Sequence, residues 1–208
     1  MITECVKMAS SAFDSDVVGV ALAIVDVTAA KPVAREITKA SELTNSPDWS
    51  AATNLIVFAR PSTSAGFDGP SDLVTIHPDG TGRTTVTSVL PRGGQTPQPA
   101  RSPDGNNPDW SRVSDRIVCT KPLRASGFDG PADLDALRPD GTGFAPLTAL
   151  AASGGDAIKP TWLPDGSGVI FNDSNGWMST ILADGTGLAP AISHDPIPGL
   201  HPRLRPTP

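Results

Sequence analysis

Tyrosine is absent from this sequence of 208 residues, and aromatic residues make up only 5% of it. Charged residues are also few, at 18%, and the formal net charge is −6. A protein that binds nucleic acid needs clustered Lys and Arg to displace counterions from the phosphates, and the sequence has no such cluster. We therefore expect neither nucleic acids nor anionic membrane surfaces among its partners.

Long hydrophobic runs are missing as well. The longest apolar run, Val17 to Val25, is about half as long as a membrane-spanning helix, so we expect no membrane insertion. The N-terminal residues include Glu4 and Lys7 but no basic region, and Asp26 interrupts the apolar run where a small-residue cleavage site would be needed. No signal peptide is therefore visible in this chain.

Motifs for catalysis and cofactor binding are missing too. Cys5 and Cys119 lie far apart without metal-site spacing, and we interpret Cys119 as a small buried hydrophobic residue rather than half of a disulfide. His77 lies at a predicted strand end, and His194 and His201 lie in a Pro-rich tail. No Gly-x-Ser-x-Gly, Walker or His-Glu-x-x-His motif occurs. We predict that the protein is not an enzyme and has no catalytic residue, cofactor or metal.

Glycine and proline, in contrast, are abundant. The 22 Pro and 20 Gly form about a fifth of the chain, which is typical of many short strands and turns and is unfavourable for long helices.

The sequence repeats itself. Pro47–Ser50 (Pro-Asp-Trp-Ser) recurs 61 positions later at Pro108–Ser111, and aligning 47–87 with 108–148 gives 20 identities in 41 positions. A third copy begins at Pro160 with Pro-Thr-Trp. Each copy closes on Asp-Gly-Thr-Gly, which we interpret as a turn rather than a phosphate-binding loop because strands, not helices, flank it. Such repetition indicates an array of similar structural units.

Each repeat contains four short apolar runs separated by turn residues, as expected for four antiparallel strands joined by hairpins. One such sheet cannot bury both faces, so the repeats must stack, with Trp49, Trp110 and Trp162 between neighbouring sheets. The predicted fold is all-β, a β-propeller of four-stranded antiparallel blades, with about three full blades plus partial blades at the ends. The predicted divisions are an N-terminal segment (1–16), a partial blade (17–44), a blade (45–90), a Pro/Gly-rich linker (91–107), two further blades (108–153 and 154–193), and a Pro-rich tail with the first strand of another blade (194–208).

The Pro-x-Trp openings, the run Leu163–Phe171 (Leu-Pro-Asp-Gly-Ser-Gly-Val-Ile-Phe) and the closing Asp-Gly-Thr-Gly resemble the TolB-type, WD40-like PD40 repeat of β-propellers. The resemblance covers approximately residues 45–192. It implies a ring of six blades, which needs on the order of 250 residues. Three explanations of the shorter chain are open: a fragment of a longer protein, a small ring completed by the N-terminal strands and His201–Leu204, or two chains that self-associate to complete one ring.

Two copies share a long insertion that is our candidate binding site. It reads Gly-Phe-Asp-Gly-Pro at 66–70 and again at 127–131. Adjacent blades would present these loops on one rim, with Phe67, Asp68, Phe128 and Asp129 as an aromatic and acidic contact patch of the kind that protein interfaces favour. Two alternatives are that these loops are structural hairpins, or that Asp68 with Asp72 and Asp129 with Asp133 bind a metal.

The resemblance implies a non-enzymatic scaffold for protein–protein interaction, periplasmic or extracellular, with a protein partner of unknown identity. The alternative is an accessory, gating propeller of a larger prolyl-oligopeptidase-like hydrolase. A downstream Gly-x-Ser-x-Gly in the same reading frame would favour this alternative.

Overall fold

The computed structural model describes residues 3–9, 19–62, 71–87, 106–122, 131–173 and 175–190, with only the backbone for 3–9 and 106. Within these ranges the regular elements are β-strands and two short 3₁₀ helices, η1 (Ala40–Glu42) and η3 (Ala151–Ser153). None of the helical segments in the described ranges has the length and apolar character needed to cross a membrane.

The strands form four antiparallel sheets, each made from consecutive strands in chain order. The first sheet has three strands, β1 (Thr3–Ala9), β2 (Val20–Asp26) and β3 (Ala34–Glu36). The second, third and fourth sheets have four strands each: β4 (Asn45–Ser50), β5 (Leu55–Pro61), β6 (Ser71–Ile76) and β7 (Thr84–Thr85); β8 (Asn106–Trp110), β9 (Ile117–Pro122), β10 (Ala132–Leu137) and β11 (Ala145–Pro146); β12 (Ile158–Trp162), β13 (Gly168–Asn172), β14 (Met178–Leu182) and β15 (Ala189–Pro190).

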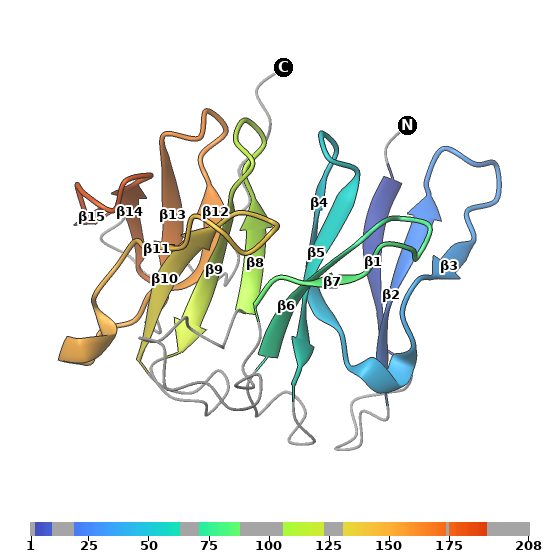
Figure 1. Cartoon of the computed structure of the whole chain (residues 1–208), viewed down its shortest axis with the longest axis horizontal. Helices are drawn as coiled ribbons and strands as arrows, with labels where there is room; N and C mark the ends of the chain where they lie inside the picture. The colour runs from blue at the N-terminus through green and yellow to red at the C-terminus, as the bar shows by residue number, and fades with distance from the viewer. Residues whose placement is uncertain are drawn as a thin grey trace.

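The sheets stack face to face in chain order, from the first at the right of Figure 1 to the fourth at the left. Three hydrophobic clusters lie between them, and each cluster combines side chains of two consecutive sheets. Leu22 of the first sheet packs with Phe58 of the second, Val57 of the second with Ile117 of the third, and Val118 with Phe171 of the fourth. The predicted all-β, blade-like architecture is therefore confirmed.

The tryptophan of each repeat lies where the sequence predicts it. Trp110 and Trp162 are each 4% exposed, and each belongs to the cluster between its own sheet and the preceding one. Trp49 is half-buried and packs against the cluster between the first and second sheets. These three residues lie on the first strands β4, β8 and β12, which contact one another in succession.

A hydrogen bond of the same kind joins successive first strands. The Trp110 N–H donates to Asp48 Oδ2 at 2.6 Å, and the Trp162 N–H donates to Asp109 Oδ2 at 2.8 Å. The Asp of one Pro-Asp-Trp element thus binds the backbone of the next Trp. A carboxylate is a strong acceptor for such a buried N–H.

The first sheet contains a strand that the sequence pattern does not predict. Residues 1–16 show no clear strand signal, yet Thr3–Ala9 forms β1 and pairs in full register with β2, from Thr3 opposite Asp26 to Ala9 opposite Val20. The start of β2 is apolar and buried. Its backbone groups need a ladder partner on the edge away from β3, and β1 supplies it.

The Asp-Gly-Thr-Gly segments are turns, as predicted. In each, the Asp carboxylate accepts hydrogen bonds from both the backbone N–H and the hydroxyl of the Thr two positions later, as Asp79 does from Thr81 at 2.8 and 2.6 Å. Asp140 and Asp184 repeat this pattern. Both glycines of each segment have positive φ, as at Gly80 (90°) and Gly82 (65°), a conformation that glycine adopts without a Cβ clash.

Candidate interaction surface

The twin insertions leave equivalent ends of two neighbouring sheets. Pro61 pairs with Ser71 at the end of the β5–β6 ladder, and Pro122 pairs with Ala132 at the end of the β9–β10 ladder. The segments between them include Phe67, Asp68, Phe128 and Asp129, which lie outside the described residues. The ladders that carry the two loops belong to the stacked second and third sheets, and the contact patch itself stays a prediction.

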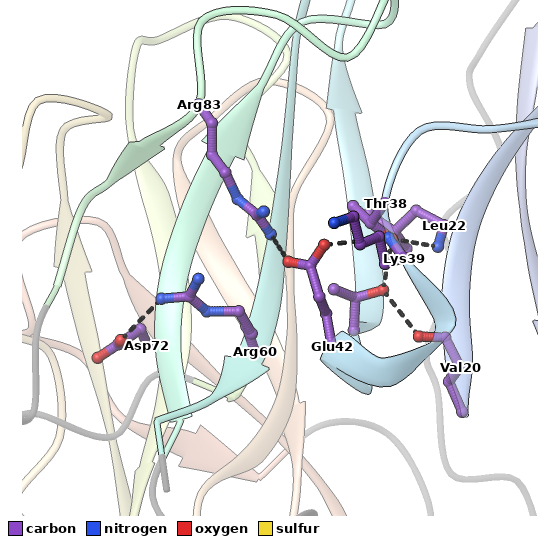
Figure 2. A network of polar contacts seen from close by, with 9 residues as sticks. Val20, Leu22, Thr38, Lys39, Glu42, Arg60, Asp72 and Arg83 are labelled. Carbon is purple, nitrogen blue, oxygen red and sulfur yellow. Dashed lines mark hydrogen bonds and ion pairs between the residues drawn. The ribbon is translucent and has the colours of Figure 1, made fainter. Parts of the chain in front are cut away.

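An ion pair crosses the base of the first loop. Arg60 and Asp72 are opposite each other on β5 and β6, with 3.4 Å between Nη2 and Oδ2. Asp72 is 6% exposed. Figure 2 shows this pair beside a second one, in which Arg83 donates to Glu42 of η1. The Arg83 guanidinium also lies 5.7 Å from the centre of the Phe58 ring, a cation–π distance.

Glu42 connects the second sheet to the segment that leads into it. Its Oε1 accepts the Lys39 N–H at 3.0 Å. Burial opposes ionisation of this side chain, but the hydrogen bonds from Arg83 and Lys39 outweigh it and hold the pKa of Glu42 below its usual value. Two ion pairs, Arg60–Asp72 and Arg83–Glu42, therefore stand next to each other, and Glu42 connects the second of them to the segment before the second sheet.

Buried threonines fix the same segment to the first sheet (Figure 2). The Leu22 N–H donates to Thr38 Oγ1 at 2.8 Å, and the Thr38 and Thr44 hydroxyls are 3.1 Å apart. Thr44 also donates its N–H to the Val20 carbonyl at 3.1 Å. The connection from the first to the second sheet is thus hydrogen-bonded at both of its ends.

The base of the second loop has a basic and an acidic residue at the same two positions, but they do not pair with each other as they do in the first loop. Lys121 stands where Arg60 does, and Asp133 stands where Asp72 does. Asp133 Oδ1 accepts hydrogen bonds from Thr148 Oγ1 (2.9 Å), the Leu150 N–H (2.6 Å) and the Ala151 N–H (3.2 Å). It therefore holds the segment that leads into η3 rather than a cross-strand cation.

Lys121 pairs instead with Asp135, at 3.6 Å from Nζ to Oδ2. Asp135 replaces Val74 of the preceding repeat, is 1% exposed, and neither of its carboxylate oxygens has a hydrogen-bond partner. Burial raises the pKa of Asp135 to about 6, and the Lys121 ammonium opposes that rise. Sequence reasoning missed this group, although a charged residue in an apolar run was the available signal.

The residues considered for catalysis have structural roles where they are described. Cys119 is a free, buried cysteine, which confirms the interpretation as a small core residue, and burial raises the pKa of its thiol. A thiol so protected is a poor nucleophile. His77 Nδ1 lies 3.2 Å from the Asn54 carbonyl oxygen; His194 and His201 lie outside the described residues.

In the described ranges no group of three or more His, Cys, Asp or Glu side chains is placed to hold a metal ion, and Asp68 and Asp129 lie outside those ranges. Asp72 and Asp133, each half of a metal pair considered from the sequence, bind Arg60 and the Leu150 segment respectively.

No family model matches the sequence, and no curated protein matches it. Solved structures do. TolB from Acinetobacter baumannii is 14% identical with a TM-score of 0.59, over 85% of this chain and 38% of that one. The putative TolB from Agrobacterium tumefaciens is 15% identical with a TM-score of 0.61, over 90% and 60%. A puromycin hydrolase is 16% identical with a TM-score of 0.53, over 86% and 26%.

The chain therefore spans less than two thirds of the length of these proteins, and the likeness concerns the fold. It agrees with the stacked antiparallel sheets, the Trp-led repeats and the Asp-Gly turns described above. By its sheets and their stacking, the chain has the fold of the TolB-type β-propellers.

Proposed function

We propose that this protein is a non-enzymatic β-propeller scaffold for protein–protein interaction. Phe67, Asp68, Phe128 and Asp129 form its contact patch. The observation that carries the proposal is the pair of matching loops leaving equivalent ends of stacked sheets, each over a base fixed by its own polar contacts. A rigid base lowers the entropy lost when the loop above it binds a partner.

The patch combines features that protein interfaces favour. Two aromatic rings supply apolar anchors, and two carboxylates beside them supply charge and orientation. A partner with a basic surface around two apolar pockets would complement it. The likeness to TolB supports a setting in the bacterial envelope or outside the cell.

The test is to replace both anchors at once. We expect Phe67→Ala combined with Phe128→Ala to abolish partner capture while leaving the melting temperature nearly unchanged. Capture is measured by photo-cross-linking from a benzoylphenylalanine placed at Ser64, which belongs to the first insertion but not to the patch, with and without the two substitutions. Val33→Ala is the matched control, because Val33 is a 75% exposed apolar residue just before β3, far from the loops in sequence.

Two results would contradict the proposed contact patch. A fall of several degrees in melting temperature would mean that the two rings are packing residues, since loss of a buried aromatic costs about 3–5 kcal/mol. Unchanged cross-linking in the double variant would likewise contradict the proposed patch.

A second candidate function is a gating propeller attached to a hydrolase domain. The likeness to the puromycin hydrolase, which covers only 26% of that protein, favours it. On this hypothesis the same reading frame encodes a Gly-x-Ser-x-Gly segment beyond the propeller, and removing that serine abolishes hydrolysis of a peptide substrate by the full-length protein. A frame without such a segment excludes this function.

A further inference from the structure

The fourth sheet has an outward face that corresponds to covered faces in the second and third sheets. Ile170 of β13 occupies the repeat position of Val118, which belongs to the cluster between the third and fourth sheets. Thr161 of β12 occupies the position of Asp48 and Asp109, whose carboxylates accept the Trp N–H of the following sheet. The positions that bind the following sheet in the earlier repeats therefore lie on this face of the fourth sheet.

Asn172 gives independent support for a neighbouring strand on this face. It is 1% exposed, and neither its side-chain oxygen nor its side-chain nitrogen has a hydrogen-bond partner. Such a buried amide is costly unless it is hydrogen-bonded. Asn172 follows Phe171 as Thr120 follows Cys119, and Thr120 Oγ1 accepts the N–H of Lys159 from the next sheet at 3.1 Å. The repeat thus gives Asn172 an acceptor role toward a following strand.

We propose that this face binds His201–Leu204 of the same chain as the first strand of a further blade. The segment reads His-Pro-Arg-Leu, with Pro202 and Leu204 at the spacing of Pro160 and Trp162. In that register the His201 N–H donates to Asn172 Oδ1, and the Leu204 N–H donates to Thr161 Oγ1. The segment lies outside the described residues, so the proposal rests on the fourth sheet and on the register.

The segment between β15 and His201 is long enough to bring His201–Leu204 to this face. In the preceding repeat the chain runs from Pro146, the last residue of β11, to Lys159, which is 13 positions. From Pro190, the last residue of β15, to His201 it is 11 positions. Eleven residues span up to about 36 Å when extended. A second copy of the chain could offer the same strand, and the experiment distinguishes the two sources.

Disulfide trapping in the full-length chain tests the register. We expect Thr161→Cys with Leu204→Cys, in a Cys5→Ser background, to form a disulfide within one chain, seen as loss of two free thiols at monomer mass. Thr161→Cys with Arg205→Cys is the matched control, because a shift of one residue turns the side chain to the opposite face of a strand, and it should cross-link far less. A disulfide between two chains, or none in the first variant, overturns the proposal.

Amide exchange provides a second measurement that needs no cysteine. In the wild-type protein the peptide covering 199–206 should exchange slowly, and Asn172→Leu should accelerate exchange there about tenfold through loss of one hydrogen bond. Exchange in β2, on the far side of the stack, should not change and reports that the protein remains folded. Equal exchange at 199–206 in both proteins overturns the predicted bond.

Discussion

Burial of Asp135 in the folded protein disfavours the ionised form of its carboxyl group. It lies on the face of the third sheet that packs against the second, beside Cys119 on the paired strand, and Lys121 is the cation that compensates it. The 3.6 Å separation is too long for a good hydrogen bond. The Lys121 ammonium also lies 6.0 Å from the centre of the Phe144 ring. Lys121 therefore interacts with this ring as well as with the Asp135 carboxylate.

The stability of the protein should therefore depend on pH through this residue. The folded pKa is about 6, above the value of about 3.9 for an unfolded Asp, so the native state binds the proton more tightly. The associated stability is fully present below about pH 4 and is lost as pH rises through 6. We expect Asp135→Asn to raise the free energy of unfolding by about 2–3 kcal/mol at pH 8 and by little at pH 4, measured by urea unfolding.

Asp140→Asn is the matched control for that measurement. Asp140 is exposed, and hydrogen bonds from the Thr142 hydroxyl and N–H lower its pKa. Its charged form is therefore favoured by folding, and the substitution should give no gain at pH 8. An equal gain from both variants would show that general charge repulsion, rather than burial of Asp135, sets the effect.

At the scale of elements, the hairpin turns connect each sheet to the one before it. An added Cβ at Gly141 would lie 2.7 Å from the Val86 carbonyl oxygen of the second sheet. At Gly185 the corresponding distance to the Leu147 oxygen is 3.3 Å, and at Gly80 the distance to the Ile37 oxygen is 3.7 Å. The three contacts repeat because the same turn packs on the end of each preceding sheet.

Alanine at these glycines should destabilise the protein in the order Gly141, Gly185, Gly80. All three have φ between 81° and 90°, so each variant carries a backbone strain of about 1 kcal/mol. Gly141→Ala adds a steric clash with backbone that costs about 1–3 kcal/mol more. Thermal unfolding measures the order.

Gly154→Ala separates strain from contact in this series. Its φ is 80°, and nothing lies within 4 Å of the added Cβ, so it reports strain alone. Gly80→Ala should resemble it. If Gly141→Ala were no more destabilising than Gly154→Ala, the turn would not pack against the second sheet as described.

At the scale of the whole molecule, the described residues of each sheet pack against those of the next sheet in the chain. The three hydrophobic clusters join the first sheet to the second, the second to the third, and the third to the fourth. Stability in such an array is close to a sum of the terms for individual sheets and for the interfaces between neighbours. A substitution at one interface should therefore destabilise mainly the two sheets that form it.

Trp162→Ala should cost about 3–5 kcal/mol and act mainly on the third and fourth sheets. Trp162 is 4% exposed in the cluster between them. We expect amide exchange to accelerate in β9, β10 and β13 while β2 keeps its wild-type rate. Trp177→Ala, at a residue that is 40% exposed, should change little. Equal acceleration in all four sheets would contradict nearest-neighbour stability.

Much of the fold follows from sequence because its signals are local. Alternating apolar runs, Asp-Gly turns and a Trp at constant spacing predict the strands of the second to fourth sheets and the position of the tryptophans. Strand β1 gives no such signal, because its formation depends on pairing with β2. Likewise, Phe67 and Phe128 can be proposed as contacts from repetition alone. Asp135 is visible in the sequence as a charge within an apolar run, but its pairing with Lys121 and the ion pair at Arg60 depend on which strands become neighbours.

Strand periodicity and turn chemistry act over a few residues, and each copy repeats them, so the amino-acid sequence is enough to predict an array of Trp-led antiparallel sheets. Which polar groups meet depends on the packing of those sheets. Asp48 binds the backbone of Trp110, 62 positions away, and Asp133 binds the segment before η3 rather than Lys121. These choices depend on how one sheet faces the next, and residues far apart in the chain become neighbours only when the sheets stack.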